Sequence, residues 1–445
     1  MTDPNRPSDH AAQPDGVSRR RLFGLAGVGA LGVGAGVAGG LAVARATDGD
    51  AGAAQTALGQ PVAGPSVWPF YGAQQSGIVT PAQDRLHFAA FDLSAAATRD
   101  DLVRLLKAWS DAAAKMTQGQ EAGEFGALSG PYDAPPDDTG EALGLPASRL
   151  TVTIGFGPGL FRDSAGRDRF GLADSQPDHL QPLPHFPSDN LRPDLTGGDL
   201  CVQACADDPQ VAVHAVRNLS RIAFGTASLR WSQLGFGRTS STSTSQATPR
   251  NLFGFKDGTA NLKAEDPAAV DEHVWVHEDD DPKASWLAGG SYLIARKIKM
   301  HIETWDRTSL SEQEQIVGRD KRDGAPLSGG DEFTLPDFEA AGRDDKPLIG
   351  PVAHIRLAHP SQNDGVRILR RGYNFADGND ELGRLSAGLF FIAFVRDPDK
   401  QFIPLQTRLS RDDTMMEYLQ HTGSGIFAVP RGAQPGGYVG DTLLA

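Results

Sequence analysis

The sequence predicts an α+β fold made of two ferredoxin-like halves, and three observations support this prediction. A chain of 445 residues is long enough for two domains or two fused halves. Residues 84–236 follow the order strand, helix, strand, strand, helix, strand, which is typical of a ferredoxin-like unit. Apolar segments after residue 290 predict a second α+β half. Two such halves, packed sheet to sheet, are expected to leave a large cavity between or beside them.

The first half is predicted from apolar strands and from helices with recognisable starts. Residues 148–156 alternate like a strand, and glycine and proline residues follow directly. Thr98 is placed to cap a helix, and Pro209 stands near a helix start, where proline is tolerated. The patterns together predict strands at 84–93, 148–156, 199–206 and 229–236, and helices at 98–117 and 209–224.

The second half begins after an acidic loop at 265–283. A long strand-like run at 290–302 comes first, and a helix is expected at 309–318. The rest of this half is predicted from strand-like segments at 353–357, 366–369 and 388–395 and a helix near 411–420.

The composition argues against nucleic acid as the main partner. The formal net charge is -14 and the isoelectric point is about 5.2, whereas phosphate binding requires a basic face. Cys201 and Cys205 are the only cysteines. On one strand they would lie about 13 Å apart, which is too far for a disulfide. We therefore predict that both are buried as small apolar residues.

The amino terminus is interpreted as an export signal. Arg19-Arg20 precedes a weakly apolar run to about Ala44, as in a twin-arginine signal, and 44–46 fits a small-x-small cleavage site. The run is also long enough to span a membrane, so an uncleaved anchor is the alternative. The predicted organisation is a signal peptide at 1–46, a linker at 47–82, a first half at 83–250 and a second half at 251–445.

One carboxylate, Asp257, stands out in the stretch 251–261. Gly254 and Gly258 allow a sharp turn there, or a close approach of the backbone to a flat ligand. Two aromatic residues supply an apolar wall. Because Asp-Gly is also a common turn dipeptide, Asp257 is either a turn residue or an acid–base group in a partly dry pocket.

His354 and the pair Arg370-Arg371 are possible chemical partners of Asp257. His354 lies in an apolar run, where an imidazole needs a hydrogen-bond partner or a metal. Paired arginines are usually surface residues, but one at the inner end of a buried strand would be a fixed cation.

Haem peroxide chemistry needs this set of groups. A histidine holds the iron, a second group moves a proton between the peroxide oxygens, and a cation stabilises the developing charge. A carboxylate can transfer the proton. Its reference pKa of about 3.9 predicts best activity in acid, unless burial raises that pKa.

On these residues the chain resembles the dye-decolorizing peroxidase family, in its exported bacterial branch. Residues 254–258 match the GxxDG motif, 353–357 match the segment with the proximal histidine, and 369–373 match the segment with the distal arginine. Supporting matches are 197–209, 289–293, 305–319 and 388–394. The resemblance extends over about 80–432, and the ordered set is far more specific than any single motif.

The resemblance implies a barrel-like fold of the dye-decolorizing peroxidase and chlorite dismutase kind, with one haem b in the second half. It implies that His354 is the proximal iron ligand, Asp257 the distal acid–base group and Arg370 the distal cation. The haem edge is expected to be lined by Gly258, Thr259, Ala260, His359, Pro360 and Ser361.

The resemblance leaves alternatives open at three positions. Arg319 is expected to bind a haem propionate, and a surface arginine at a helix end is the alternative. His359 is the rival axial ligand to His354. Asp397 is considered as the acceptor of a hydrogen bond from the axial imidazole, although a surface turn is the alternative.

The resemblance implies an exported peroxidase that reduces hydrogen peroxide and oxidises dyes, phenols or other one-electron donors. Besides these substrates, the twin-arginine export machinery is an expected partner. The alternative is a haem- or iron-handling protein that releases iron from haem, with iron-uptake proteins or metalloproteins as partners. Both interpretations place the mature protein outside the cytoplasm, as a secreted, periplasmic or cell-wall protein.

Overall fold

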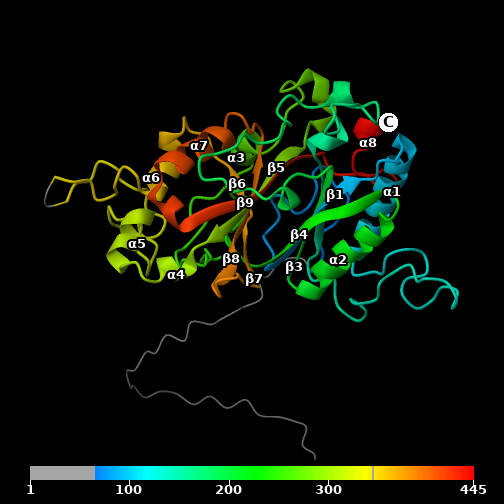
Figure 1. The fold of residues 1–445 in the computed structure, drawn as a ribbon, viewed down its shortest axis with the longest axis horizontal. Helices are drawn as coiled ribbons and strands as arrows, with labels where there is room; N and C mark the ends of the chain where they lie inside the picture. Colours follow the sequence, from blue (N-terminus) through cyan, green and yellow to red (C-terminus); the bar gives the residue numbers. More distant parts are fainter. Residues whose placement is uncertain (1–65, 343–344) are drawn as a thin grey trace, which may run out of the picture. The chain divides into compact units, whose positions relative to one another are not determined.

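In residues 66–342 and 345–445, which the computed structural model describes, the chain forms a closed barrel of eight antiparallel strands. Around the barrel the order is β5-β9-β2-β3-β1-β4-β7-β8, and β5 pairs with β8 to close it (Figure 1). A short strand, β6, pairs with β8 beyond the end of β7. The strands are β1 Arg85–Leu93, β2 Thr151–Phe156, β3 Leu200–Ala206, β4 Ala227–Arg238, β5 Ser291–Met300, β6 Leu369–Arg370, β7 Tyr373–Asn379, β8 Leu385–Val395 and β9 Leu419–Val429. The predicted α+β class is confirmed.

The helices lie outside the barrel, with α1 and α2 on one side and α4 to α7 on the other (Figure 1). They are α1 Arg99–Met116, α2 Pro209–Ile222, α3 Pro267–His273, α4 Ile302–Trp305, α5 Leu310–Val317, α6 His354–Ala358, α7 Phe402–Asp412 and α8 Asp441–Leu444. Short 3-10 helices are η2 Pro158–Leu160, η3 Ala173–Ser175, η4 Pro193–Leu195, η5 Pro282–Leu287, η6 Pro360–Gln362 and η7 Thr414–Tyr418. None of the helices in the described residues is both long and apolar enough to cross a membrane.

The two long helices of the first half begin where their capping residues predict. Thr98 caps α1 by accepting a hydrogen bond from the Asp101 amide, and the Asp101 carboxylate accepts one from the Thr98 amide in return. Asp208 caps α2 through the Gln210 amide, with Pro209 in the first position. Both caps satisfy amide groups that a helix start otherwise leaves without a partner.

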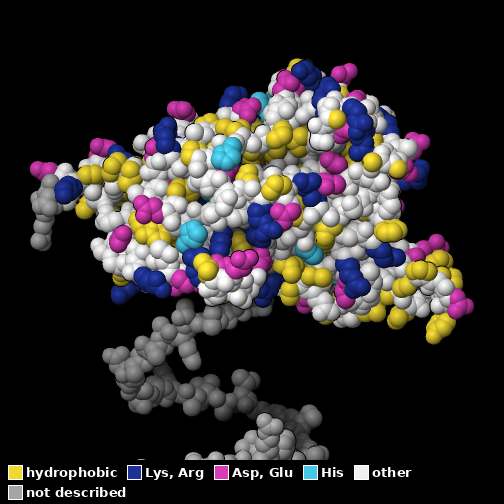
Figure 2. All heavy atoms as spheres, viewed as in Figure 1, with side chains coloured by type: hydrophobic (Ala, Val, Ile, Leu, Met, Phe, Trp, Pro, Cys, Tyr) yellow, Lys and Arg dark blue, Asp and Glu magenta, His cyan; other side chains and the backbone are white. Residues whose placement is uncertain are grey.

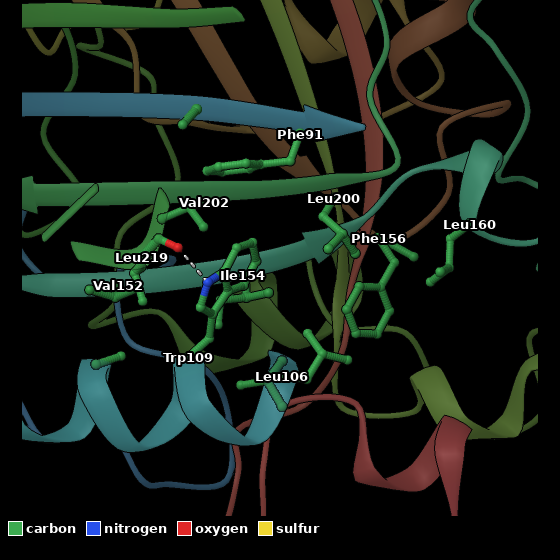
Figure 3. Close-up of a cluster of buried hydrophobic side chains, with 14 of the residues drawn as sticks. Phe91, Leu106, Trp109, Val152, Ile154, Phe156, Leu160, Leu200, Val202 and Leu219 are labelled. Atoms are coloured by element: carbon green, nitrogen blue, oxygen red, sulfur yellow. Dashed lines mark hydrogen bonds between the residues drawn. The ribbon is translucent and has the colours of Figure 1, made fainter. Parts of the chain in front are cut away.

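One apolar core fills the space between the barrel and helices α1 and α2. In Figure 3, Trp109 of α1 lies against β2 side chains, and its indole nitrogen donates a 2.8 Å hydrogen bond to the Leu219 carbonyl of α2. The Phe91 and Trp109 rings lie 5.2 Å apart. This hydrogen bond leaves the fully buried indole with no unsatisfied polar group.

The barrel interior is a second core, and it is packed rather than hollow. Phe88 of β1 contacts Phe390 of β8 and Phe427 of β9, whose strands are not its neighbours in the sheet. Such contacts must cross the interior. Cys201 and Cys205 are also buried here as free thiols, as predicted. In the described residues, the open space expected between the two halves is therefore not inside the barrel.

Two secondary-structure predictions for the second half need correction. The segment 353–357 was expected to be strand-like, but it forms helix α6. The helix expected near 411–420 ends at Asp412, and strand β9 begins at Leu419. These short stretches carry too few residues for their apolar period to separate helix from strand.

The predicted linker at 47–82 is also wrong for its described part. Phe70, Ile78 and Ala82 are buried, so residues 66–82 belong to the folded unit. The signal peptide predicted at 1–46 lies outside the described residues. Figure 2 shows Lys and Arg side chains interspersed with Asp and Glu on the face drawn.

A buried ion pair and a neutral histidine lie together at β5 and β9. Arg296 of β5 pairs with Asp189, and their side chains are 1% and 0% exposed. His421 of β9 is buried as well. Burial, reinforced by the charge of Arg296, lowers the pKa of His421 to about 3.

We expect His421→Gln to flatten the pH dependence of stability below neutral pH. A histidine in the unfolded chain takes up a proton near pH 6.5, whereas His421 does so in the folded protein only at about 3. The unfolded state binds more protons in this window. The stability of the wild type therefore decreases as the pH decreases, by up to about 1.4 kcal/mol per pH unit from this residue.

Chemical denaturation from neutral pH down to about pH 4 measures this slope. The half-exposed His277, replaced in His277→Gln, is the matched control and should leave the slope at the wild-type value. An equally steep slope in His421→Gln and wild type would contradict the prediction.

Candidate active site

Asp257 and Arg370, which are 113 residues apart in the sequence, form an ion pair. Arg370 Nη1 lies 2.6 Å from Asp257 Oδ1, and the two side chains are 27% and 13% exposed. The side-chain nitrogen Nδ2 of Asn251 donates a 3.2 Å hydrogen bond to the other carboxylate oxygen, Oδ2. The carboxylate is therefore held at both oxygens while part of the pair still faces open space.

The stretch that carries Asp257 is fastened to β6 by one side chain, Asn261. Its amide nitrogen donates to the Arg370 carbonyl and its oxygen accepts from the Arg370 amide, both at 2.8 Å. Asn261 thus pairs with Arg370 as a neighbouring strand would. Arg370 itself pairs with Ala393 of β8, so the barrel positions the arginine and Asn261 brings Asp257 to it.

Gly258 allows the same stretch to lie against the backbone of Ser240. Its φ is +88°, and a Cβ atom at this position would lie 2.8 Å from Ser240 Cα. A side chain here would be strained by both the φ angle and the contact. Gly258 begins a turn in which the Asn261 backbone amide donates to the Gly258 carbonyl, and Asp257 stands directly before this turn, with its carboxylate on Arg370.

The two adjacent arginines point to opposite faces. Arg371 is fully buried and donates hydrogen bonds to the Thr80 carbonyl and to Gln83 Oε1. Arg370 points the other way, to Asp257. The period of two along an extended chain produces this division, and it directs the first arginine of the pair to Asp257.

His354 stands at the start of α6 and is held by Asp413. Its Nδ1 lies 2.7 Å from Asp413 Oδ2, and the Asp413 side chain is 2% exposed. The second Asp413 oxygen accepts a 2.8 Å hydrogen bond from the Met415 amide at the start of η7. The Nε2 side of the ring stays available, because 33% of the His354 side chain is exposed.

The pKa of His354 responds to the charges of Asp413 and of the Asp257–Arg370 pair. Burial alone would lower the pKa of His354, but the Asp413 carboxylate outweighs burial and the pKa ends above its usual value. Asp257 also raises this pKa and Arg370 lowers it. Both members of the pair therefore lie near enough to the imidazole to act on its charge.

Asp397, considered from sequence as the partner of the axial imidazole, lies elsewhere. Its carboxylate contacts Lys400 and the loop amides of Asp399 and Lys400. The partner is Asp413, which lies 59 residues after His354 in the sequence. The only local sequence signal of Asp413 is its position before Thr414 at a helix start.

Helix α6 has an unusual exposure pattern for its position. It packs beside α5 and α7, and its sequence His-Ile-Arg-Leu-Ala is mainly apolar, yet none of its residues is fully buried. An apolar helix face that neighbouring elements leave partly open suits a flat ligand with apolar faces.

The other predicted site residues lie on the flanking loops. Thr259 donates a 3.2 Å hydrogen bond to Glu332, which also pairs with Lys256, and Ala260 is exposed. Glu332 and Asn261 were not predicted from the sequence, because neither stands in a recognisable chemical motif.

His359, Pro360 and Ser361 form the start of η6. His359 Nδ1 lies 2.8 Å from Ser361 Oγ and accepts a hydrogen bond from the Ser361 amide. Burial and the charge of Arg319 lower the pKa of His359. Arg319 is nine-tenths buried and donates through Nη1 to the carbonyls of Gly324 and Glu332, so it is not the surface arginine of the alternative interpretation.

The barrel carries an aspartate–arginine pair and a carboxylate-bound histidine near enough to feel the charges of that pair. Residues 75–237 match the family model of the Dyp-type peroxidase N-terminal domain, and residues 248–434 match that of the C-terminal domain. The chain belongs to the Dyp-type peroxidase family and is a haem peroxidase.

The individual relatives agree with this assignment. The chain is 38% identical to a protein named deferrochelatase from Escherichia coli O157:H7, over 96% of this chain and 97% of the relative. Ferric DtpA from Streptomyces lividans is 40% identical, with a TM-score of 0.76, 85% of this chain and 97% of that chain being covered. A Dyp-type peroxidase from Cellulomonas bogoriensis is also 40% identical, with a TM-score of 0.74 over 86% of this chain and 99% of that chain.

The residues present fit a haem. An imidazole with Nδ1 bound to a carboxylate and Nε2 open is the usual proximal ligand arrangement of a metal-bound histidine. The imidazole belongs to a partly open, mainly apolar helix, α6. The charges of the Asp257–Arg370 ion pair act on it. A donor set of this kind suits an iron porphyrin held from one side.

We expect Asp413→Ala to destabilise the protein by about 1–3 kcal/mol, because it leaves the buried side of His354 without a partner and removes the cap of η7. Asp413→Asn should lose less stability than Asp413→Ala, since its single amide oxygen can still accept one of the two hydrogen bonds that the two oxygens of Asp413 accept. Urea denaturation of the haem-loaded protein measures the difference. Equal stabilities of the wild type and Asp413→Ala would show that the contact does not hold α6 in place.

Proposed function

We propose that this protein reduces hydrogen peroxide at a haem b held by His354, and takes electrons from one-electron donors such as phenols or dyes. Asp257 is the acid–base group and Arg370 the distal cation. The observation that carries the proposal is the 2.6 Å Asp257–Arg370 pair, together with an Asp413-bound imidazole whose pKa responds to both members of that pair.

Each residue has a separate task in this proposal. Bound haem supplies the redox-active iron at which peroxide is reduced. Asp257 accepts a proton from one peroxide oxygen and returns it to the other, so that water can leave. Arg370 stabilises the negative charge that develops as the oxygen–oxygen bond breaks, and it also holds the carboxylate in place.

On the other side of the site, Asp413 orients the His354 ring and strengthens it as a ligand, which leaves Nε2 for the iron. His359 is the weaker choice of axial ligand, because its Nδ1 is bound to Ser361 rather than to a carboxylate. We assign His359, Pro360 and Ser361 to the haem edge, together with Gly258, Thr259 and Ala260. The free donors of Arg319 are assigned to a propionate.

We expect Asp257→Ala and Arg370→Leu to keep haem and to lose peroxide turnover by about a hundredfold or more, the range for an acid–base group or a charge-stabilising donor. Haem content from the Soret band, and steady-state oxidation of a phenol, measure the two properties separately. Asp84→Ala, which breaks a mainly exposed ion pair with Arg238, is the matched control and should keep full turnover. Wild-type turnover in Asp257→Ala would remove Asp257 from its assigned role.

A second candidate function is the release of iron from haem, and it is favoured by the name deferrochelatase of relatives that are 38% identical over nearly the whole chain. In this case haem is the substrate, and the partners are iron-uptake proteins or metalloproteins. The two functions give different products. With haem and a reductant but no peroxide, iron release yields metal-free porphyrin, whose red fluorescence is absent from haem. Porphyrin fluorescence in this assay, together with no phenol oxidation when peroxide is supplied, would favour this second function.

We also propose export by the twin-arginine route, with the mature protein acting outside the cytoplasm. The support is the sequence Arg19-Arg20 followed by a weakly apolar run. This route carries proteins that are already folded, so it suits a chain that takes up its haem before export.

A further inference from the structure

A histidine and two aspartates meet at a place remote from His354, Asp257 and Arg370. His179 comes from the loop between η3 and η4, and Asp397 and Asp399 follow β8. In the described residues these three side chains offer ligand atoms that all lie within 4.8 Å of one another. His179 Nδ1 lies 2.7 Å from Asp399 Oδ2 and 3.7 Å from Asp397 Oδ1.

The cluster opens on a cavity of about 340 Å³. Five carboxylates line this cavity, among them Asp280 and Asp281, against two cations, Arg396 and Lys400. Arg396 already forms a bidentate salt bridge with Asp280, through Nε and Nη2. The excess of negative charge favours a cation as the ligand of this cavity.

Tyr292 provides an independent observation that points to a ligand. The residue is 1% exposed and lines the same cavity, with its ring edge-on to the His179 imidazole at 6.2 Å. In the described residues no protein group accepts or donates a hydrogen bond at its hydroxyl, and the hydroxyl is not sealed in the core, so it is left to a ligand in the cavity. Burial, and then the charges of Asp281 and Asp397, raise the pKa of this hydroxyl, so it remains a hydrogen-bond donor.

Lys400 is the competing cation for this cluster, but its ion pair with Asp397 is weak. Its ammonium lies 2.8 Å from Asp397 Oδ2, on the oxygen other than the one nearest His179. The Lys400 side chain is 80% exposed, and an ion pair of this kind adds little stability. The position between His179 and the two carboxylates is therefore left for another cation.

We propose that His179, Asp397 and Asp399 bind one first-row divalent transition-metal ion, with the Tyr292 hydroxyl donating a hydrogen bond to a ligand oxygen or metal-bound water. One imidazole nitrogen and two carboxylate oxygens suit Mn²⁺, Fe²⁺ or Zn²⁺, whereas Ca²⁺ and Mg²⁺ prefer oxygen alone. The ion takes the place of the hydrogen bond between His179 Nδ1 and Asp399 Oδ2. This site shares no residue with the proposed peroxide site and does not depend on that function.

Titration of the haem-loaded full chain tests the proposal. Binding of Mn²⁺ is followed by loss of the free-ion electron paramagnetic resonance signal, and binding of Zn²⁺ by calorimetry. We expect one saturable ion per chain, and a loss of affinity of about tenfold or more in His179→Ala and in Asp399→Asn. Tyr292→Phe should weaken binding less, because it removes only an outer hydrogen bond.

His277→Ala is the matched control, because His277 pairs with one carboxylate, Asp271, at 3.2 Å and lies outside the cavity lining. It should bind the ions as the wild type does. The Asp399 side chain is 55% exposed, so Asp399→Asn keeps the test valid even where His179→Ala fails to fold. The proposal is overturned by an absence of saturable binding, by equal affinities in Asp399→Asn and wild type, or by Mg²⁺ binding as tightly as Mn²⁺.

Discussion

The pairing of β5 with β8 is the constraint on which the rest of the structure depends. It closes the sheet into a barrel, so none of the eight barrel strands is left as a free edge. The closed barrel encloses Phe88, Phe390 and Phe427, which touch across the interior. With β8 fixed on one side by β5, its other side is free to pair with β7 and β6. The last residue of β6 is Arg370, and the barrel thereby fixes a cation at its outer surface.

The same strand geometry explains why two adjacent arginines serve different purposes. Arg371 points inward and ties Thr80 and Gln83 to the barrel, so residues near 80 belong to the fold although their composition is that of a linker. Arg370 points outward to Asp257. An inward arginine without a carboxylate partner depends on carbonyl and amide oxygens, and the buried position supplies them. A shift of this strand by one residue would exchange the two roles.

The long elements could be predicted from sequence, and the chemical pairs could not. Helix α1 could be predicted from its capping residue Thr98, and β2 from its alternating pattern, because these signals are local. The segment at 353–357 was misread since a five-residue apolar helix has no distinct period. Strand β9 was missed because Gly423 and Gly425 interrupt its apolar pattern. Asp257 and Arg370 are separated by 113 residues, so residue types alone suggested their pairing without establishing it, and only the resemblance to a family made it specific.

The partner of His354 shows what remains inaccessible to sequence reasoning. Asp397 and Asp413 stand on either side of helix α7, and both precede residues typical of a turn or a helix start. Which of them meets His354 is decided by how α7 packs against α6, a tertiary contact without a sequence signature.

Helix α7 also separates the two sites physically. Its 11 residues rise about 16 Å, with Asp397 and Asp399 before its first turn and Asp413 after its last. The proposed metal ligands and the carboxylate that holds His354 are thus attached to opposite ends of one helix.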